Sequence, residues 1–162
     1  MFPDLTSPHL DSLRLEQNSH HLLKQSHCPT HHIGALLATN VLPWIDDEQE
    51  NGQTKEEWKG MSESNKILGY KTPIPIDSTC VRDSTLRSHC QTITMQLKQD
   101  ISLTDIESKL KQANPWVQLI PNKKEATLTH LTPVATANSL NIHVGRLRRM
   151  HQGPRCVQPV SY

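Results

Sequence analysis

A chain of 162 residues suits a single domain, and a formal net charge of +1 gives no electrostatic reason to expect a nucleic acid or an anionic membrane as partner. No apolar run approaches the ~20 residues needed to span a bilayer, and the N-terminus lacks the basic and apolar regions of a signal peptide, so we expect a cytoplasmic protein. The four cysteines form no C-x-x-C pair and apolar residues make up 35% of the chain, which predicts reduced thiols and a thin core.

The first third of the chain is predicted to contain little regular structure before one helix. Residues 1–32 are polar, with apolar positions in poor helical phase, and are expected to be irregular or partly helical. The apolar run "IGALLATNVLPWID", residues 33–46, predicts buried chain that leads into a loop. Thr54 and Glu57 then have the spacing of a capping box, which predicts a helix from that point to about Leu68.

The middle of the chain alternates between extended and helical patterns. Pro73 and Pro75 favour extended chain, which we expect to continue as a strand to about Arg82. The string "QTITMQLK", residues 91–98, alternates apolar and polar residues, which is typical of a half-buried strand.

Residues 102–115, "SLTDIESKLKQANP", predict a helix that Thr104 and Glu107 cap and that ends at Asn114, before a proline. Three later strings favour strands: "WVQLIP", "TLTHLTP" and "SLNIHVG". This order predicts an α+β fold with a mixed, largely antiparallel sheet and helices packed on one face.

The segment from His20 to His32 is rich in histidine and includes Cys28, and both are common zinc ligands. Structural zinc sites usually take ligand pairs from two separated segments, and no second cluster follows, so we expect no metal site here. A metal-binding protein remains an alternative, as does a nucleic-acid patch at "GRLRRM", residues 145–150.

Two pairs of charged residues are candidates for a binding site. Glu56 and Lys59 are three residues apart, so on a helix both side chains project from one face, although an ordinary solvated ion pair has the same spacing. In "CVRDSTLRSHC", Arg82 and His89 are separated by a turn-like "DST" and are expected to converge on one pocket. There an arginine binds a carboxylate or phosphate and a histidine carries a proton.

The alternative for Arg82 is a structural pairing with Asp77 or Asp83, with His89 as a surface histidine.

Three long strings together carry a resemblance to a known family. They are "LPWIDDEQENGQTKEEWKGMSESNKIL", "PIPIDSTCVRDSTLRSHCQTITMQLKQD" and "NPWVQLIPNKKEATLTHLTPVATANSLNIHVGRLRRM". They resemble the C-terminal substrate-binding and dimerisation half of bacterial aspartate-semialdehyde dehydrogenase. The resemblance covers residues 33–150, with 1–32 poorly matched and 151–162 a divergent tail. It implies a truncated domain of the glyceraldehyde-3-phosphate-dehydrogenase-like C-terminal type.

The resemblance also implies roles for four residues and a reaction. Arg82 of "CVR" matches the arginine that binds the substrate carboxylate, and His89 of "RSH" matches the acid/base histidine. Glu56 of "KEEWK" matches the glutamate at the substrate amino group, and Lys59 matches the lysine at the phosphate subsite. The family reduces 4-aspartyl phosphate to L-aspartate 4-semialdehyde with NADPH, in the biosynthesis of lysine, threonine and methionine.

The sequence departs from the family in ways that bear on activity. It contains no G-x-G-x-x-G turn for NADP and no "GNCT"-like nucleophile string, so we expect a fragment that is inactive alone. Cys90 is not assigned as the nucleophile. Ser78 and Ser84 replace family glycines and are expected to be strained if those positions need a positive φ. The expected partner is a second copy or a full-length homologue; the alternative is a non-catalytic dimerisation module or a decayed gene product.

Overall fold

The computed structural model describes residues 17, 21 and 30–162. The chain divides into two units, Met1–Ser84 and Thr85–Tyr162. The N-terminal segment 1–32 lies outside the described residues except for positions 17, 21 and 30–32, and so does most of the histidine cluster.

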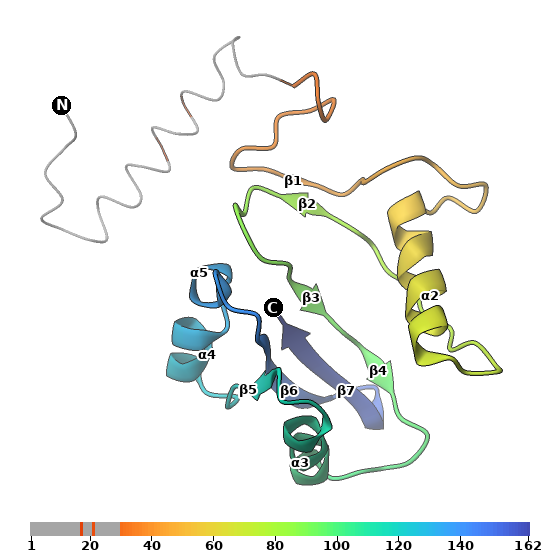
Figure 1. Ribbon diagram of the computed structural model, residues 1–162, viewed down its shortest axis with the longest axis vertical. Coiled ribbons are helices and arrows are strands. Elements are labelled where there is room, and N and C mark those ends of the chain that lie inside the picture. The colour runs from red at the N-terminus through yellow and green to blue at the C-terminus, as the bar shows by residue number, and fades with distance from the viewer. Residues whose placement is uncertain (1–16, 18–20, 22–29) are drawn as a thin grey trace, which may run out of the picture. The chain divides into compact units, whose positions relative to one another are not determined.

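Residues 30–84 of the first unit contain one helix and one short strand pair (Figure 1). Its elements are β1 (Val41–Leu42), α2 (Lys55–Leu68) and β2 (Arg82–Asp83). β1 and β2 pair antiparallel, with Leu42 opposite Arg82. The helix predicted after Thr54 is confirmed to its last residue, and Gly69 ends it with a left-handed φ of 63°.

The second unit is a sheet with three helices (Figure 1). Its elements are β3 (Gln91–Thr92), β4 (Met95–Gln96), α3 (Leu103–Ala113), β5 (Val117–Leu119), α4 (Lys124–His130), α5 (Pro133–Thr136), β6 (Ile142–Met150) and β7 (Gly153–Ser161). The long strands β6 and β7 pair antiparallel in the middle of the sheet. β3 and β4 both pair antiparallel with the outer side of β7, and β5 pairs parallel with β6.

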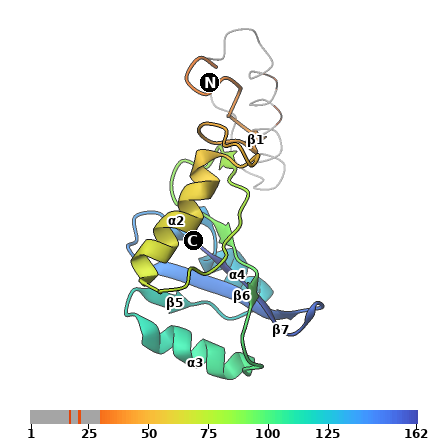
Figure 2. The ribbon, with the colours of Figure 1, turned by 90° about the vertical axis from the view of Figure 1, so that its right-hand side faces the viewer.

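This arrangement confirms the predicted α+β class with a mixed, largely antiparallel sheet. α3 packs against β5 and β6 and runs alongside them in Figure 2. The divergent residues 151–162 include β7, so they contribute a central strand of the sheet.

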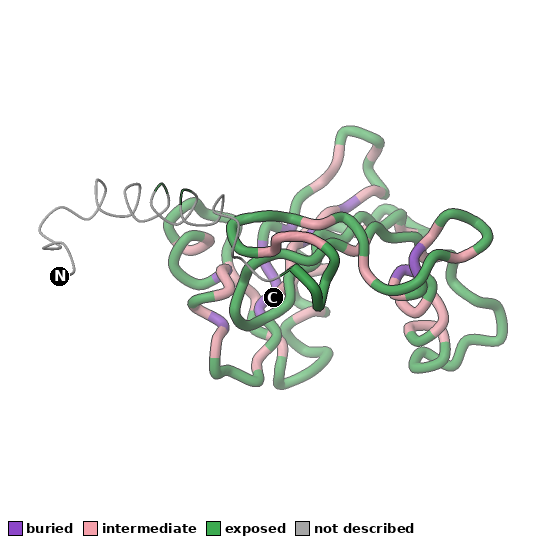
Figure 3. The backbone as a smooth tube through the Cα atoms, turned by 90° about the horizontal axis from the view of Figure 1, so that it is seen from above, coloured by how far each residue is buried: buried purple, intermediate pink, exposed green. Residues whose placement is uncertain are grey.

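Few side chains are fully buried in the described residues, and Figure 3 shows the buried positions as short, separated stretches of the backbone. The buried apolar side chains are Leu131, Val144, Leu147 and Val157, all in the second unit. Gly145 also lies in this region, where a Cβ atom would come within 2.8 Å of Leu131 Cδ2. The expected buried run at 33–46 is wrong, because every residue in it is exposed or only half-buried.

The predicted strand at 91–98 is interrupted and more exposed than expected. Ile93 N donates to the carbonyl of Pro159, but Pro159 has no N–H to return a bond, so β3 and β4 remain separate two-residue strands. Ile93 and Met95 each keep 36% of their surface exposed.

Two other local predictions are corrected. "TLTHLTP", residues 127–133, contains the end of α4 and the first residue of α5 instead of a strand, because so short an alternation fits helix and strand periods alike. The N-cap of α3 is Ser102, two residues before the predicted Thr104, since Ser102 Oγ accepts a bond from Asp105 N. Its predicted end at Asn114 is confirmed.

The arginines of "GRLRRM" make contacts within the second unit. Arg146 donates to Asn122 Oδ1 at 2.7 Å, and Arg148 donates to Gln158 in the paired strand. Arg149 forms a 2.8 Å ion pair with Asp100. This geometry gives no support to the nucleic-acid alternative. In the part of the chain that is described, no helix combines the length and apolarity needed to cross a membrane.

Because Val157 is 0% exposed, we expect Val157→Ala to destabilise the second unit by about 2 kcal/mol through the lost methyl groups and the cavity they leave. The measurement is the free energy of unfolding from urea denaturation. Val134→Ala is the matched control, since Val134 is 88% exposed and the same change should cost less than about 0.5 kcal/mol. Equal losses for the two variants would contradict this account of the core.

Candidate functional site

The candidate site in the first unit is organised around the first turn of α2. Thr54 caps the helix: its Oγ1 accepts from Glu57 N, and the Glu57 carboxylate accepts from Thr54 N at 2.8 Å. This confirms the predicted capping box. Thr54 is 1% exposed and Glu57 is 8% exposed, so these bonds are protected from competition with water.

The second oxygen of Glu57 connects the helix to the segment that carries Arg82. Cys80 N donates to Glu57 Oε1 at 2.9 Å. One carboxylate therefore accepts backbone N–H groups from two segments of the chain. These bonds, first from Thr54 and then from Cys80, lower the pKa of Glu57 below its ordinary value of 4.5.

A second hydrogen bond joins the start of α2 to the segment before Arg82. Gln53 Nε2 donates to Asp77 Oδ1 at 2.9 Å, and the same oxygen accepts from Ser78 N. The Asp77 carboxylate is thus occupied by partners other than Arg82, which removes one of the two structural pairings proposed from sequence for that arginine.

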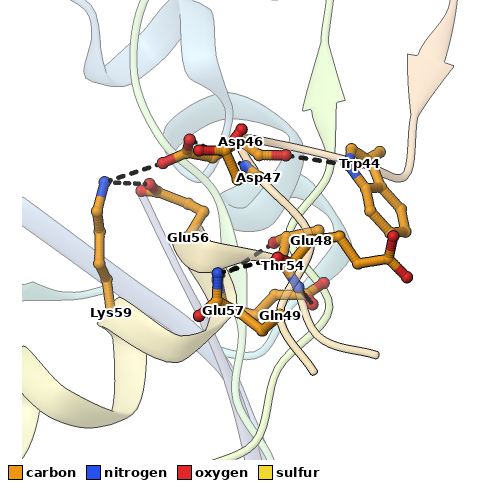
Figure 4. Close-up of polar contacts among 9 residues, drawn as sticks. All are labelled: Trp44, Asp46, Asp47, Glu48, Gln49, Thr54, Glu56, Glu57 and Lys59. Atoms are coloured by element: carbon orange, nitrogen blue, oxygen red, sulfur yellow. Dashed lines mark hydrogen bonds and ion pairs between the residues drawn. The ribbon is translucent and has the colours of Figure 1, made fainter. Parts of the chain in front are cut away.

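Glu56 and Lys59 lie side by side on α2, as predicted (Figure 4). Lys59 Nζ is 3.1 Å from Glu56 Oε2 and 3.4 Å from Asp46 Oδ2, so the ammonium bridges two carboxylates. The side chains of Lys59 and Glu56 are 35% and 43% exposed, which leaves both heads accessible to a ligand. The hydrogen bond and charge of Glu56, with a smaller contribution from Asp46, raise the pKa of Lys59.

Asp46 is held in place by its own turn. It has a φ of 71°, its Oδ1 accepts from Asp47 N, and its carbonyl accepts from Trp44 Nε1 at 3.0 Å (Figure 4). The bond from Asp47 N is the main cause of a lowered Asp46 pKa. Sequence reasoning missed Asp46 because thirteen residues separate it from Lys59 and no helical spacing relates them. It also assigned Glu57 only to capping, since the bond to Cys80 spans a loop.

Arg82 lies in β2 and is exposed, which suits a cation that meets a ligand from solution. Among the described residues it forms no ion pair. Ser78 and Ser84, expected to be strained where the family has glycine, are not among the residues with positive φ. The positive φ that would make serine unfavourable is therefore absent at both positions.

His89 belongs to the second unit and is exposed. It lines a cavity of about 450 Å³ together with Arg87, Ser88 and Thr136. The convergence of Arg82 and His89 on one pocket stays a prediction, since the two residues lie in different units. Within the described residues, no three His, Cys, Asp or Glu side chains are grouped so as to hold a metal ion.

We expect Glu57→Gln to make the free energy of unfolding depend less on pH in the acid range. Because the pKa of Glu57 in the folded chain is lowered from 4.5, its stabilisation is present above the unfolded pKa and is lost as pH falls through the folded pKa. A glutamine keeps one acceptor and loses this pH dependence. The measurement is the free energy of unfolding from neutral pH into acid, with Glu63→Gln on an exposed position of α2 as control. An equal loss of pH dependence in Glu63→Gln would contradict this assignment.

We also expect Glu56→Gln to lower the pKa of Lys59 more than Asp46→Asn does, because the Glu56 contact is the shorter and stronger of the two. NMR titration of the lysine side-chain resonances measures this directly. Lys66, in the last turn of the same helix, is the internal reference and should not move. A larger effect from Asp46→Asn would reverse the ranking of the two contacts.

Comparison with known proteins places this geometry in a family. A sequence profile described as the semialdehyde dehydrogenase dimerisation domain matches residues 9–161. The aspartate semialdehyde dehydrogenase of Francisella tularensis superimposes with a TM-score of 0.84 at 40% identity, over 96% of this chain and 43% of that one.

Two more distant structures share the fold. Aspartate semialdehyde dehydrogenase II of Vibrio cholerae gives a TM-score of 0.76 at 24% identity, over 91% of this chain and 42% of that one. A probable aspartate-semialdehyde dehydrogenase of Pseudomonas aeruginosa gives 0.74 at 18% identity, over 94% and 44%. The chain spans less than half the length of each of these proteins. The resemblance seen in the sequence is therefore confirmed: the chain belongs to the semialdehyde dehydrogenase family and contains its dimerisation domain.

Proposed function

We propose that this chain is the substrate-binding and dimerisation part of an NADP-dependent aspartate-semialdehyde dehydrogenase, and that it needs the nucleophile and cofactor domain of another segment or chain for turnover. The observation that carries the proposal is the Glu56–Lys59 pair on α2. Its two opposite charges are half exposed, 3.1 Å apart, and on a helix whose first turn is tethered to the Arg82 segment.

The charges of the substrate match this arrangement. Aspartate semialdehyde has an ammonium and a carboxylate, and the reaction also uses inorganic phosphate. In the proposal, Glu56 binds the ammonium and Lys59 binds the phosphate, each as a charge-assisted contact. The Glu56–Lys59 ion pair keeps both heads oriented before substrate arrives, which reduces the entropy lost on binding.

Arg82 is assigned to the substrate carboxylate. Its planar guanidinium matches the two carboxylate oxygens in a bidentate contact, and none of the described residues competes for it through an ion pair. The Glu57–Cys80 bond is close in sequence to Arg82, so it limits how far the arginine segment moves from α2.

His89 is assigned as the acid/base. A histidine is suited to accept and return a proton near neutral pH, and this one lines a cavity large enough for a small substrate. In the proposal it takes the proton released when the thiol nucleophile attacks the aldehyde and later returns a proton to the reacting group.

NADP does not fit the described residues. Among the described strands, β5 and β6 form the single parallel pair, and residues 120–123, which connect β5 to α4, contain no glycine for the turn that a pyrophosphate needs. We therefore assign no NADP contact to this chain and derive no step through the cofactor.

A second candidate function is a non-catalytic dimerisation module that binds another copy or a full-length homologue. The match to the dimerisation domain favours it, as do large exposed apolar side chains such as Leu86, which is 98% exposed.

The test is a hybrid in which this chain replaces the matching region of the Francisella tularensis enzyme. We expect NADP-dependent turnover of aspartate semialdehyde with phosphate, and we expect His89→Asn to lower kcat by ~10²–10³ with little change in KM. Arg82→Leu should raise the KM for aspartate semialdehyde by at least ~10-fold through the lost charge-assisted bonds.

His151→Asn is the matched control, since His151 is an exposed histidine of the same unit. Full activity in the His89→Asn hybrid would refute the acid/base assignment. A folded hybrid without activity, together with a stable dimer of the purified chain in sedimentation, would favour the second candidate.

A further inference from the structure

The backbone is in an unfavourable conformation directly before His89. Ser88 has a φ of 78°, one of five positive values among the non-glycine residues described. In this left-handed region the Cβ of an L-residue crowds its own backbone, so the conformation persists only where surrounding contacts maintain it. Such a contact therefore has to exist close to Ser88.

The side chain of Ser88 makes this contact with Thr136. The two hydroxyl oxygens are 2.9 Å apart, although 48 residues separate them in the sequence. Thr136 is 5% exposed, so water does not compete effectively for the bond.

The direction of the bond follows from the other partners of Thr136. Its Oγ1 lies 3.1 Å from the Thr132 carbonyl and 3.3 Å from the Pro133 carbonyl. Carbonyl oxygens only accept, so a bond to either of them uses the single hydroxyl proton of Thr136. In that arrangement Ser88 donates its own proton to Thr136 Oγ1.

The acceptor belongs to a well-ordered element. Thr136 is the last residue of α5, which Thr132 caps through a bond from Ala135 N to its Oγ1. Backbone bonds from Thr136 N to Thr132 O and from Ser139 N to Thr136 O hold the threonine from both sides. Its hydroxyl is thus a defined anchor for the chain that enters His89.

We propose that the Ser88–Thr136 hydrogen bond positions His89, by holding Ser88 at positive φ so that the imidazole stays beside the cavity that both residues line. Ser88 and Thr136 are positioning residues: they act through His89 and not on the substrate. The inference rests on the proposed acid/base role of His89 for its functional meaning, but the positioning itself is a property of this unit. No sequence pattern relates the two residues, and the resemblance assigns neither a role.

Two substitutions separate the hydrogen bond from the backbone strain. Ser88→Ala removes the hydroxyl and keeps the penalty for positive φ, so the backbone is expected to leave this conformation and His89 to change direction. Ser88→Gly also removes the hydroxyl but tolerates positive φ, so the loss of order at His89 should be smaller. Thr136→Val removes the acceptor, and Thr136→Ser restores it.

The experiment is NMR relaxation of the histidine ring Cε1–Hε1 groups in the purified full chain, without substrate or cofactor. In the unsubstituted chain we expect the His89 ring to have a higher order parameter than the ring of exposed His151. In Ser88→Ala and Thr136→Val the His89 value should fall to that of His151, while Thr136→Ser should keep it. His143 is the internal reference: its Nδ1 lies 2.7 Å from His130 O in the same unit, and its ring should be unaffected.

An unchanged His89 ring in Ser88→Ala would overturn the proposal, and so would a His89 ring already as mobile as His151 in the unsubstituted chain. Ser88 is exposed, so Ser88→Ala should leave the fold intact. This variant therefore tests the positioning of His89 even if Thr136→Val unfolds. The result is independent of the proposed function, which fails separately if the His89→Asn hybrid keeps its activity.

Discussion

The candidate site of the first unit depends on the two hydrogen bonds that the Glu57 carboxylate accepts. The carboxylate accepts one backbone N–H from Thr54, at the start of α2, and another from Cys80, two residues before Arg82. Leaving either donor without a partner in this nearly buried place would cost free energy, so the two segments stay together. Glu57, and not Glu56 or Lys59, makes the hydrogen bonds that join these two segments. The charged groups of Glu56 and Lys59 are therefore left half exposed.

The second unit depends on a different constraint, the long antiparallel pairing of β6 and β7. Val157 in β7 is fully buried, and Val144 and Leu147 in β6 complete most of a small core. Few other apolar side chains are buried, which agrees with the low apolar content of the sequence. Many large apolar side chains stay exposed in the described residues, as expected for a domain whose family match is to a dimerisation region.

The predictions from sequence succeeded where one local pattern decides the structure. The Thr54–Glu57 capping box located α2, and the i,i+3 spacing put Glu56 and Lys59 together, because both depend only on helical geometry. They failed where distant residues decide. Pro159 interrupts the pairing of residues 91–98 with β7. The strand predicted for "TLTHLTP" was wrong because a short alternation does not distinguish the helical period from the strand period. The strain expected at Ser78 and Ser84 was found at neither, while Ser88 has the positive φ.

The amino-acid sequence by itself determined the family, the α+β class, the helix of the candidate site and its exposed Glu56–Lys59 pair, since these follow from motifs and from residues close in the chain. Only the tertiary structure decided which groups hold those residues in place. Glu57 reaches Cys80 across 23 positions, Lys59 reaches Asp46 across 13, and Ser88 reaches Thr136 across 48. The physical reason is that a hydrogen bond is specified by distance and direction in space, and a loop brings its two partners together without leaving a periodic signal in the sequence.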